Sequence, residues 1–499
     1  MQSIRILRHV NVLRRRLSHL KGQTRLASRW IAPAFVNELA KTYEKGSQER
    51  DELTRALQNV KKQLPAKIPI SIGSGTHKEL VAQYASASTK EAKPAWEALP
   101  FEDRASIFLR ACELITGKYR YELMAATMLG QVETVDFFRQ YININEKGSW
   151  NRMEYRPLEG FLYAVSPFNF TALGATLVGP AALLGNVVVW KPSDSALYAS
   201  WILHRILLEA GLPKDVVQFV PGDPETVTDA VLNRPEFAGL TFIGSTAVFK
   251  GLQGKIGKAT AEGRFNQYPR VVGETGGKNF HLVHSSADVK SAAFNTLRAA
   301  FEYQGQKCSA CSRVYVTESV WPEFKKHLQE ETAKMKVGPP EDYSNFVNAV
   351  IHERAFDRLN EVIESAKLDP ELELIAGGRA NKENGFFVHP TIYQTTNPCH
   401  DIMSRELFGP LFSKTLDLIN TTSRYALTGS IFAVDAQALR RAQDVLEHAA
   451  GNLYLNTNRD SGTNDKTGTV ALVRRYTSVR TIKEDFIPLD EVQYPSNEV

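Results

Sequence analysis

Short apolar runs alternate with helix-like segments from residue 161 onward, and this alternation restricts the fold more than any other feature of the chain. Each run is apolar at nearly every position, as strands are when both faces of a sheet are covered. The runs lie at 161–165, 187–190, 216–220, 240–243 and 280–283, and the helix-like segments at 171–184, 195–210, 225–232 and 246–258. Strands that alternate with helices predict a parallel sheet with right-handed crossovers, and therefore an α/β fold.

A second α/β segment is expected after residue 290. Its predicted elements are a helix at 288–301, a loop around Cys308, a strand at 313–316 and a helix at 321–335. Before the first sheet, residues 38–63 and 76–130 have helical character, and near the C-terminus alternating polar and apolar positions at 477–487 predict an added edge strand.

The positive charge of the chain is concentrated in its first 37 residues. This segment holds eight Lys or Arg residues and no acid. Subtracting its charge of +8 from the net charge of +5 leaves about −3 for the remaining chain. Apolar residues recur there at three- and four-residue steps from Ile4 to Leu20, which predicts an amphipathic helix. This composition predicts a mitochondrial presequence; the alternative is a basic arm that binds lipid or RNA. No run of 18 apolar residues is present, so no membrane-spanning helix is predicted.

The four cysteines do not predict a disulfide framework in a chain of 499 residues. Cys308 and Cys311 form a C-x-x-C, which suits a redox pair or half of a zinc site. The sequence offers no second C-x-x-C, no H-x₃₋₅-H and no H-E-x-x-H to complete a metal shell, so no metal site is expected.

Two motifs carry a potential nucleophile and a potential base. Cys308 follows a glycine-containing turn and lies between small residues and Lys307, surroundings that can favour a thiolate. Its alternative role is that of an inert core cysteine. Glu274 precedes paired glycines between two apolar runs, so we expect a carboxylate on a tight turn at a sheet end, or a helix-capping residue.

Two further motifs follow predicted strands. Asn169 comes directly after the first strand, where its amide could cap the next helix or donate to a developing oxyanion. Lys191 and Ser193 end the second strand, where a ribose or phosphate would bind in a parallel sheet. The usual dinucleotide fingerprint G-x-G-x-x-G is absent, so a dinucleotide would need a variant loop.

Taken together and in this order, the motifs resemble those of the aldehyde dehydrogenase superfamily, from about residue 90 to the C-terminus. They are Pro-Phe-Asn at 167–169, Val-Val-Trp-Lys-Pro-Ser at 188–193, Gly-Ser-Thr at 244–246, Glu-Thr-Gly-Gly-Lys at 274–278, Gly-Gln-Lys-Cys at 305–308 and Glu-Leu-Phe-Gly-Pro at 406–410. The segments at 166–172, 265–270, 302–313 and 461–465 are similar to the branch that oxidises glutamate γ-semialdehyde to glutamate in mitochondrial proline breakdown.

The resemblance implies the fold, the reaction and the site. The fold would be a Rossmann-like NAD-binding domain at 38–272, with 140–157 as the remnant of an oligomerisation flap, an α/β catalytic domain at 273–465 and an oligomerisation segment at 466–499. Cys308 would be the nucleophile, Asn169 the oxyanion donor and Glu274 the general base. NAD would be bound by Ser166, Lys191, Gly244, Ser245, Thr246, Ala247, Val248 and Glu406, and the substrate by Lys307, Ser309, Ser461 and Gly462. A homodimer in the mitochondrial matrix, with 470–499 as an exchanged edge, is also implied.

Several segments are shorter than the family pattern, and they motivate two alternatives. The helix expected after Gln131, the strand between 410 and 416, the glycine-rich stretch before Ser461 and the region around 70–85 are contracted. Asp460 stands where a small neutral residue is expected beside a carboxylate site. The chain could therefore be a non-catalytic homologue that keeps the fold as a binding partner, or a dehydrogenase for another aldehyde.

Overall fold

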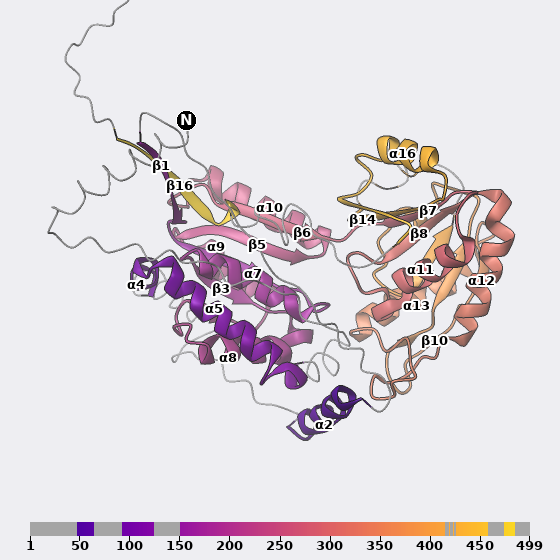
Figure 1. Cartoon of the computed structure of the whole chain (residues 1–499), viewed down its shortest axis with the longest axis horizontal. Helices are drawn as coiled ribbons and strands as arrows, with labels where there is room; N and C mark the ends of the chain where they lie inside the picture. The colour runs from indigo at the N-terminus through magenta and orange to yellow at the C-terminus, as the bar shows by residue number, and fades with distance from the viewer. Residues whose placement is uncertain are drawn as a thin grey trace, which may run out of the picture. The chain divides into compact units, whose positions relative to one another are not determined.

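Two sheets of mainly parallel strands form the centre of the chain in the computed structural model (Figure 1), which describes residues 47–63, 92–123, 150–414, 426–457 and 474–484 and the single residues 419 and 423. The predicted presequence and the predicted substrate residues Ser461 and Gly462 lie outside these ranges. One sheet has five strands in the order β4-β3-β2-β5-β6, and the other has seven in the order β15-β14-β7-β8-β13-β12-β9. The predicted α/β fold is confirmed.

The five-stranded sheet is parallel throughout, as expected from its apolar runs. Its strands are β2 (Phe161–Val165), β3 (Val187–Lys191), β4 (Val217–Phe219), β5 (Phe237–Gly244) and β6 (Arg270–Thr275), and its helices are α7 (Thr171–Leu183), α8 (Leu197–Glu209), α9 (Pro224–Leu232) and α10 (Thr246–Ala261). Successive residues of β2 enter different cores: Leu162 packs with α7 and α8, and Phe161 packs with α9 and α10. The strand therefore has no polar face, which explains the uninterrupted apolar run.

The seven-stranded sheet is built in the same way from the second half of the chain. Its strands are β7 (Asn279–Val283), β8 (Cys311–Val316), β9 (Glu373–Ala376), β12 (Thr391–Gln394), β13 (Leu411–Lys414), β14 (Thr428–Phe432) and β15 (Asn452–Leu455), and its longer helices are α11 (Val289–Phe301), α12 (Trp321–Lys334), α13 (Glu353–Ala366) and α16 (Ala436–Val445). Only β9 runs antiparallel to its neighbour among these described strands. β13 pairs with both β8 and β12, so the contracted segment after residue 410 still forms a strand.

The change from one sheet to the other falls at residues 276–278. The strand β6 was not predicted, because only alternate residues of this edge strand are buried and no apolar run results. The expected domain boundary after residue 272 falls inside β6. Glu274 is the penultimate residue of this strand, so the expectation that it lies on the turn itself is corrected.

The strand expected near the C-terminus pairs with a distant part of the same chain. β16 (Thr477–Glu484) is antiparallel to β1 (Trp150–Pro157), and Figure 1 shows this two-stranded sheet beside the first large sheet. The carbonyl of Tyr476 accepts a 2.9 Å hydrogen bond from the Asn186 amide, and the Tyr476 hydroxyl lies 2.8 Å from that of Thr241. The edge strand predicted at 477–487 therefore pairs with β1 and is not added to either of the large sheets.

The remaining described elements are short or precede the first sheet. They are α2 (Gln48–Gln63), α4 (Lys93–Ala98), α5 (Phe101–Thr116), β10 (Ala380–Asn381), β11 (Phe387–Val388), α14 (Asp401–Ser404) and the 3₁₀ turns η3 (Asp194–Ala196), η4 (Glu302–Gly305) and η5 (Glu318–Val320). α5 packs against α7 and α8. None of the described helices has the length and hydrophobicity needed to cross a bilayer.

Candidate active site

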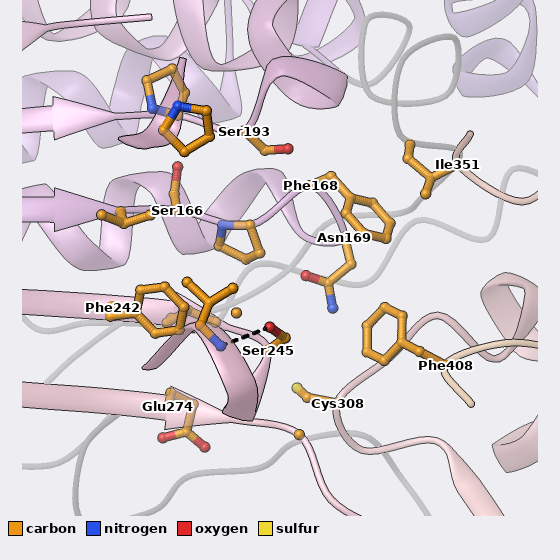
Figure 2. A pocket seen from close by; sticks show the side chains of 18 of the residues that line it. Ser166, Phe168, Asn169, Ser193, Phe242, Ser245, Glu274, Cys308, Ile351 and Phe408 are labelled. Carbon is orange, nitrogen blue, oxygen red and sulfur yellow. Dashed lines mark hydrogen bonds between the residues drawn. The ribbon is translucent and has the colours of Figure 1, made fainter. Parts of the chain in front are cut away.

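A cavity of about 500 Å³ lies at the carboxyl ends of β2, β3, β5 and β6 and is bordered by the loop that carries Cys308. Ten of the residues singled out in the sequence line it: Ser166, Asn169, Lys191, Ser193, Gly244, Ser245, Val248, Glu274, Cys308 and Glu406. Ligands of open parallel sheets bind at this end of the strands. The cavity therefore combines the candidate nucleophile with the candidate cofactor residues, as Figure 2 shows.

A turn with left-handed backbone conformation precedes Cys308 and places it at this cavity. After α11, three consecutive residues, Tyr303, Gln304 and Gly305, have φ angles of 54°, 56° and 64°. A Cβ atom on Gly305 would lie 2.5 Å from the carbonyl oxygen of Gly409, so this position needs glycine. The strained Gln304 is stabilised through its amide, which accepts from Asn348 N–H at 3.1 Å and donates to the Ala349 carbonyl at 3.2 Å.

Asn169 and Glu274 approach the same space from the first sheet. Both side chains are buried, with Asn169 following β2 and Glu274 near the end of β6. Figure 2 shows the Asn169 amide directed into the cavity that Cys308 borders. No described residue hydrogen-bonds to the Asn169 side chain, so its N–H groups remain available to a ligand. An amide donor, a thiol and a carboxylate are thus brought to one cavity.

The N-terminus of α10 supplies an anion site at the wall of the cavity. Ser245 caps the helix by accepting a 3.3 Å hydrogen bond from Val248 N–H, and the first turn contains no acid. The free N–H groups and the positive end of the helix dipole favour a phosphate here. Thr246 and Ala247 form the first turn but do not line the cavity.

Lys191 and Ser166 are anchored at the ends of the two central strands. The buried Lys191 ammonium lies 3.1 Å from Asp194, and Ser166 Oγ accepts a 2.9 Å hydrogen bond from the Trp190 indole. Both residues therefore have fixed positions on the cavity wall. The hydroxyl of Ser166 can still donate to a bound group.

Glu406 is pressed against the turn that joins the two sheets. A Cβ atom on Gly276 would lie 1.8 Å from the Glu406 carboxylate, and the backbone N–H of Gly277 donates to that carboxylate. Burial raises the pKa of Glu406, while the charges of Lys278 and Arg358 oppose this rise. A carboxylate held in this way is a suitable acceptor for ribose hydroxyls.

Lys278 is a buried cation beneath this site. Its ammonium makes no hydrogen bond to any described residue, and burial, with Arg313 nearby, lowers its pKa to about 7. The unfolded chain keeps this proton up to about pH 10.4. Folding therefore disfavours the charged form, and the penalty is greatest at or below pH 7.

Replacing Lys278 with methionine is expected to raise the free energy of unfolding by roughly 1–4 kcal/mol at neutral pH, because a buried charge that makes no hydrogen bond to a described residue is removed. The gain should shrink as the pH rises from 7 towards 10, since the wild-type folded state has by then lost the proton. Urea unfolding across this pH range measures the effect, with the exposed Lys258→Met as control. A gain independent of pH would contradict the prediction.

Some sequence-predicted residues are not brought to the cavity. The ammonium of Lys307 lies 2.9 Å from Glu302 and Lys307 does not line the cavity, so its predicted contact with substrate is not seen. Ser309 does not line it either; its carbonyl accepts a 3.0 Å hydrogen bond from the Thr428 hydroxyl. Neither residue is therefore part of the cavity wall that Cys308 lines.

Other lining residues were missed by the sequence reasoning. Ile351 and His352 directly precede α13 and Arg358 lies within it, and Phe168 and Phe408 form an edge-to-face pair at 6.0 Å on the cavity wall. Phe408 has a φ of 51°, and the Glu-Leu-Phe-Gly-Pro motif was a signal that could have identified it. The α13 residues belong to no recognisable motif and reach the site only through the tertiary fold.

A thiol with an amide donor and a carboxylate, set beside a phosphate-binding helix end, defines a thiol enzyme that uses a nucleotide cofactor. The chain belongs to the aldehyde dehydrogenase family, whose sequence model matches residues 66–469. This confirms the resemblance inferred from the motifs.

Relatives at 40–46% identity are named for one branch of that family. The chain is 46% identical to a mitochondrial delta-1-pyrroline-5-carboxylate dehydrogenase of Emericella nidulans, with all of both chains covered. It is 40% identical to the mitochondrial delta-1-pyrroline-5-carboxylate dehydrogenase of Homo sapiens, over 92% of this chain and 94% of that protein. Among solved structures, the Mycobacterium tuberculosis enzyme bound with NAD matches with a TM-score of 0.85 and 35% identity, over 95% of this chain and 100% of that one.

The comparison with the Emericella nidulans protein also bears on the contracted segments. It runs over 572 aligned positions, whereas this chain has 499 residues, a difference of 73. At least that many positions of the relative have no counterpart here. The shortening inferred from the motifs is therefore confirmed in total length.

Proposed function

We propose that this chain oxidises L-glutamate γ-semialdehyde, the open form of 1-pyrroline-5-carboxylate, to L-glutamate with NAD⁺. The observation that carries the proposal is the single cavity shared by Cys308, Asn169 and Glu274. The names of the full-length relatives support the substrate, and the NAD-bound structural neighbour supports the cofactor.

In the first step the Cys308 thiolate attacks the aldehyde carbon and forms a tetrahedral thiohemiacetal. The Asn169 amide and the Cys308 backbone N–H hold the resulting oxyanion. One such donor contributes roughly 3–4 kcal/mol in comparable sites. Burial of Asn169 strengthens this interaction, because little water competes for the same N–H groups.

The residues present fit a dinucleotide. The α10 N-terminus would hold the pyrophosphate, Lys191 and Glu406 would hold ribose hydroxyls, and Ser166 and Phe408 border the remaining space. NAD⁺, when bound, supplies the acceptor for the hydride that leaves the thiohemiacetal. Gly244 and Ser245 form the variant turn that replaces the missing fingerprint.

In the second step Glu274 activates water to hydrolyse the Cys308 thioester. The carboxylate is held on β6 at the cavity wall, so it can take a proton from water that reaches the thioester. Hydrolysis releases glutamate and regenerates the thiol. Ser461 and Gly462 are proposed to bind the α-carboxylate and to set the specificity.

Replacing Gly276 with alanine is expected to weaken NAD⁺ binding roughly 10- to 100-fold, because the added methyl displaces Glu406 from its hydrogen-bonding position. Calorimetric titration with NAD⁺ measures the change. Gly251→Ala is the matched control, since a Cβ there meets nothing within 4 Å. Equal affinities for the Gly276→Ala variant and the wild type would argue against Glu406 as a ribose ligand.

The function is tested by following NADH formation by the purified protein with glutamate γ-semialdehyde, succinic semialdehyde and short aliphatic aldehydes. The proposal requires the highest kcat/KM with the first. A clear preference for another aldehyde supports a changed substrate pocket. NAD⁺ binding without turnover of any aldehyde supports the non-catalytic homologue, the alternative that the contracted segments favour.

A homodimer in the mitochondrial matrix is proposed on two observations. Among the described strands, β15 is an outer strand of the seven-stranded sheet, and three apolar side chains at the ends of β14, α16 and β15 are exposed: Val434, Val445 and Leu455. Several relatives are named mitochondrial. Sedimentation equilibrium tests the dimer, and a fluorescent fusion of residues 1–37 tests the presequence.

A further inference from the structure

One buried side chain connects the loop of Cys308 to a neighbouring strand. Asn279, the first residue of β7, is 2% exposed. Its Nδ2 donates to the carbonyl oxygens of Cys308 at 2.7 Å and Ala310 at 2.9 Å. Its Oδ1 accepts from the N–H groups of Leu427 at 2.8 Å and Thr428 at 3.0 Å. The amide thus uses both donors and both acceptor sites on backbone groups.

These bonds hold the loop on the side that follows the nucleophile. On the preceding side, Gln306 Oε1 accepts from Ile351 N–H at 2.9 Å. After Cys308, the Asn279 amide donates hydrogen bonds to two backbone carbonyls, and the Thr428 hydroxyl donates one to the Ser309 carbonyl. Cys308 itself belongs to no helix or strand. The orientation of its peptide group is therefore fixed by these side-chain contacts together with the turn hydrogen bond from Ala310 N–H to the Lys307 carbonyl at 3.0 Å.

The partner strand is also connected to the rest of the second sheet. Leu427 O accepts a 2.9 Å hydrogen bond from Asn452 N–H at the start of β15, and β14 pairs with both β7 and β15. The position of the Cys308 loop is therefore fixed relative to three strands through one amide. A shift of about 1 Å in a reacting atom costs about 100-fold in rate.

We propose that Asn279 is a positioning residue for Cys308, which holds the thiol facing Asn169 and Glu274. This inference rests on the proposed function only in taking Cys308 as the nucleophile. Asn279 does not line the cavity, so it acts through the loop and touches no substrate.

Two substitutions of Asn279 separate the hydrogen bonds that its amide donates from those that it accepts. Asn279→Ala removes all four hydrogen bonds. Asn279→Asp keeps the shape and one acceptor for Leu427 and Thr428, but it turns a second oxygen towards the carbonyls of Cys308 and Ala310. These acceptors repel that oxygen unless the new carboxyl is protonated, when it can donate to one of them.

The matched control is Asn186, which is buried in the first sheet. Its Oδ1 accepts from Leu158 N–H, and its Nδ2 donates to the carbonyls of Ala181 and Tyr476, each at 2.9 Å. Replacing Asn186 removes a comparable set of buried bonds far along the chain from Cys308. The same substitutions there report the cost of losing buried bonds without disturbing the nucleophile loop.

The test measures alkylation of Cys308 by iodoacetamide in the full-length protein, read by mass spectrometry of the Cys308 peptide from pH 6 to 10. It is combined with kcat, KM and the NAD⁺ dissociation constant. Asn279→Ala and Asn279→Asp are expected to lower kcat roughly 100-fold, as misplacement of a reacting atom does. NAD⁺ affinity should stay within about threefold, since no cofactor residue is changed.

The alkylation profile distinguishes positioning from a structural role. The rate of Cys308 alkylation in Asn279→Asp should be lower than in the wild type, and this difference should shrink as the pH falls. Protonation of the introduced carboxyl restores a hydrogen-bond donor to the loop. Thr428→Val, which removes one bond from the same loop and serves if the Asn279 variants do not fold, should show a smaller deficit. Wild-type alkylation in the folded Asn279 variants, or equal losses in the Asn186 variants, would overturn the proposal. Alkylation needs no aldehyde, so absence of turnover in the wild type would refute the proposed function and leave this test intact.

Discussion

Replacing Cys308 with alanine is expected to abolish NADH formation, with a decrease in kcat of at least about 10⁴-fold, as is found when a covalent nucleophile is removed. The cavity contains no other described thiol that could form the thioester. Binding of NAD⁺ should be unchanged, because the helix N-terminus, Lys191 and Glu406 are untouched. Steady-state rates and calorimetric titration of the same preparation measure both quantities.

Cys311→Ala is the matched control for this prediction. Cys311 is buried, its thiol donates towards the Arg313 carbonyl at 3.5 Å, and burial raises its pKa to about 12. It therefore stays a protonated thiol at neutral pH, and its loss should reduce stability more than turnover. A Cys308→Ala protein with wild-type turnover, or a Cys311→Ala protein as inactive as Cys308→Ala, would refute the assignment of the nucleophile.

The second large effect is expected at Glu274. Glu274→Gln keeps the size of the side chain and removes the base, so hydrolysis of the thioester should slow by roughly 10²- to 10⁴-fold. The first step does not need this base, and a pre-steady-state burst of one NADH per active site should remain. Stopped-flow absorbance records the burst, and intact-mass measurement should detect the acyl group on the protein.

The exposed Glu262→Gln serves as control, since Glu262 follows α10 on the surface and should leave turnover unchanged. Loss of the burst in Glu274→Gln would show that the carboxylate is needed before the thioester forms. In that case the rate of Cys308 alkylation would fall as well, and Glu274 would be the base for the thiol instead.

The sequence predicted the layers of the fold because each central strand is buried on both faces and is therefore apolar throughout. The elements β2, β3 and β5 and the helices α7 to α10 were all found within a few residues of their observed bounds. β6 was not predicted, because only alternate residues of this edge strand are buried and its sequence therefore contains no continuous apolar run. Because this strand was not predicted, Glu274 was expected on a turn.

The candidate site was predictable where local motifs carry it. Asn169 follows β2 and Glu274 lies near the end of β6, and the sheet brings these strand ends together, while Cys308 reaches the same cavity from the loop that precedes β8. Lys307 shows the limit of this reasoning. Proximity to Cys308 in sequence suggested a contact with substrate, but a neighbouring residue on a tight loop turns the other way, towards Glu302. Arg358 lies 50 positions from Cys308 and could be assigned to the site only from the tertiary structure.

The anchoring of Tyr476 determines the order in which the protein can fold during synthesis. This residue is buried in the core of the first sheet, where its carbonyl and hydroxyl meet Asn186 and Thr241. The partner strand of β1 follows directly after it. A ribosome adds roughly 5–20 residues per second, so the first sheet waits tens of seconds for its last core residue to be made. The core of the first sheet can therefore be completed only after the whole of the second sheet has been synthesised.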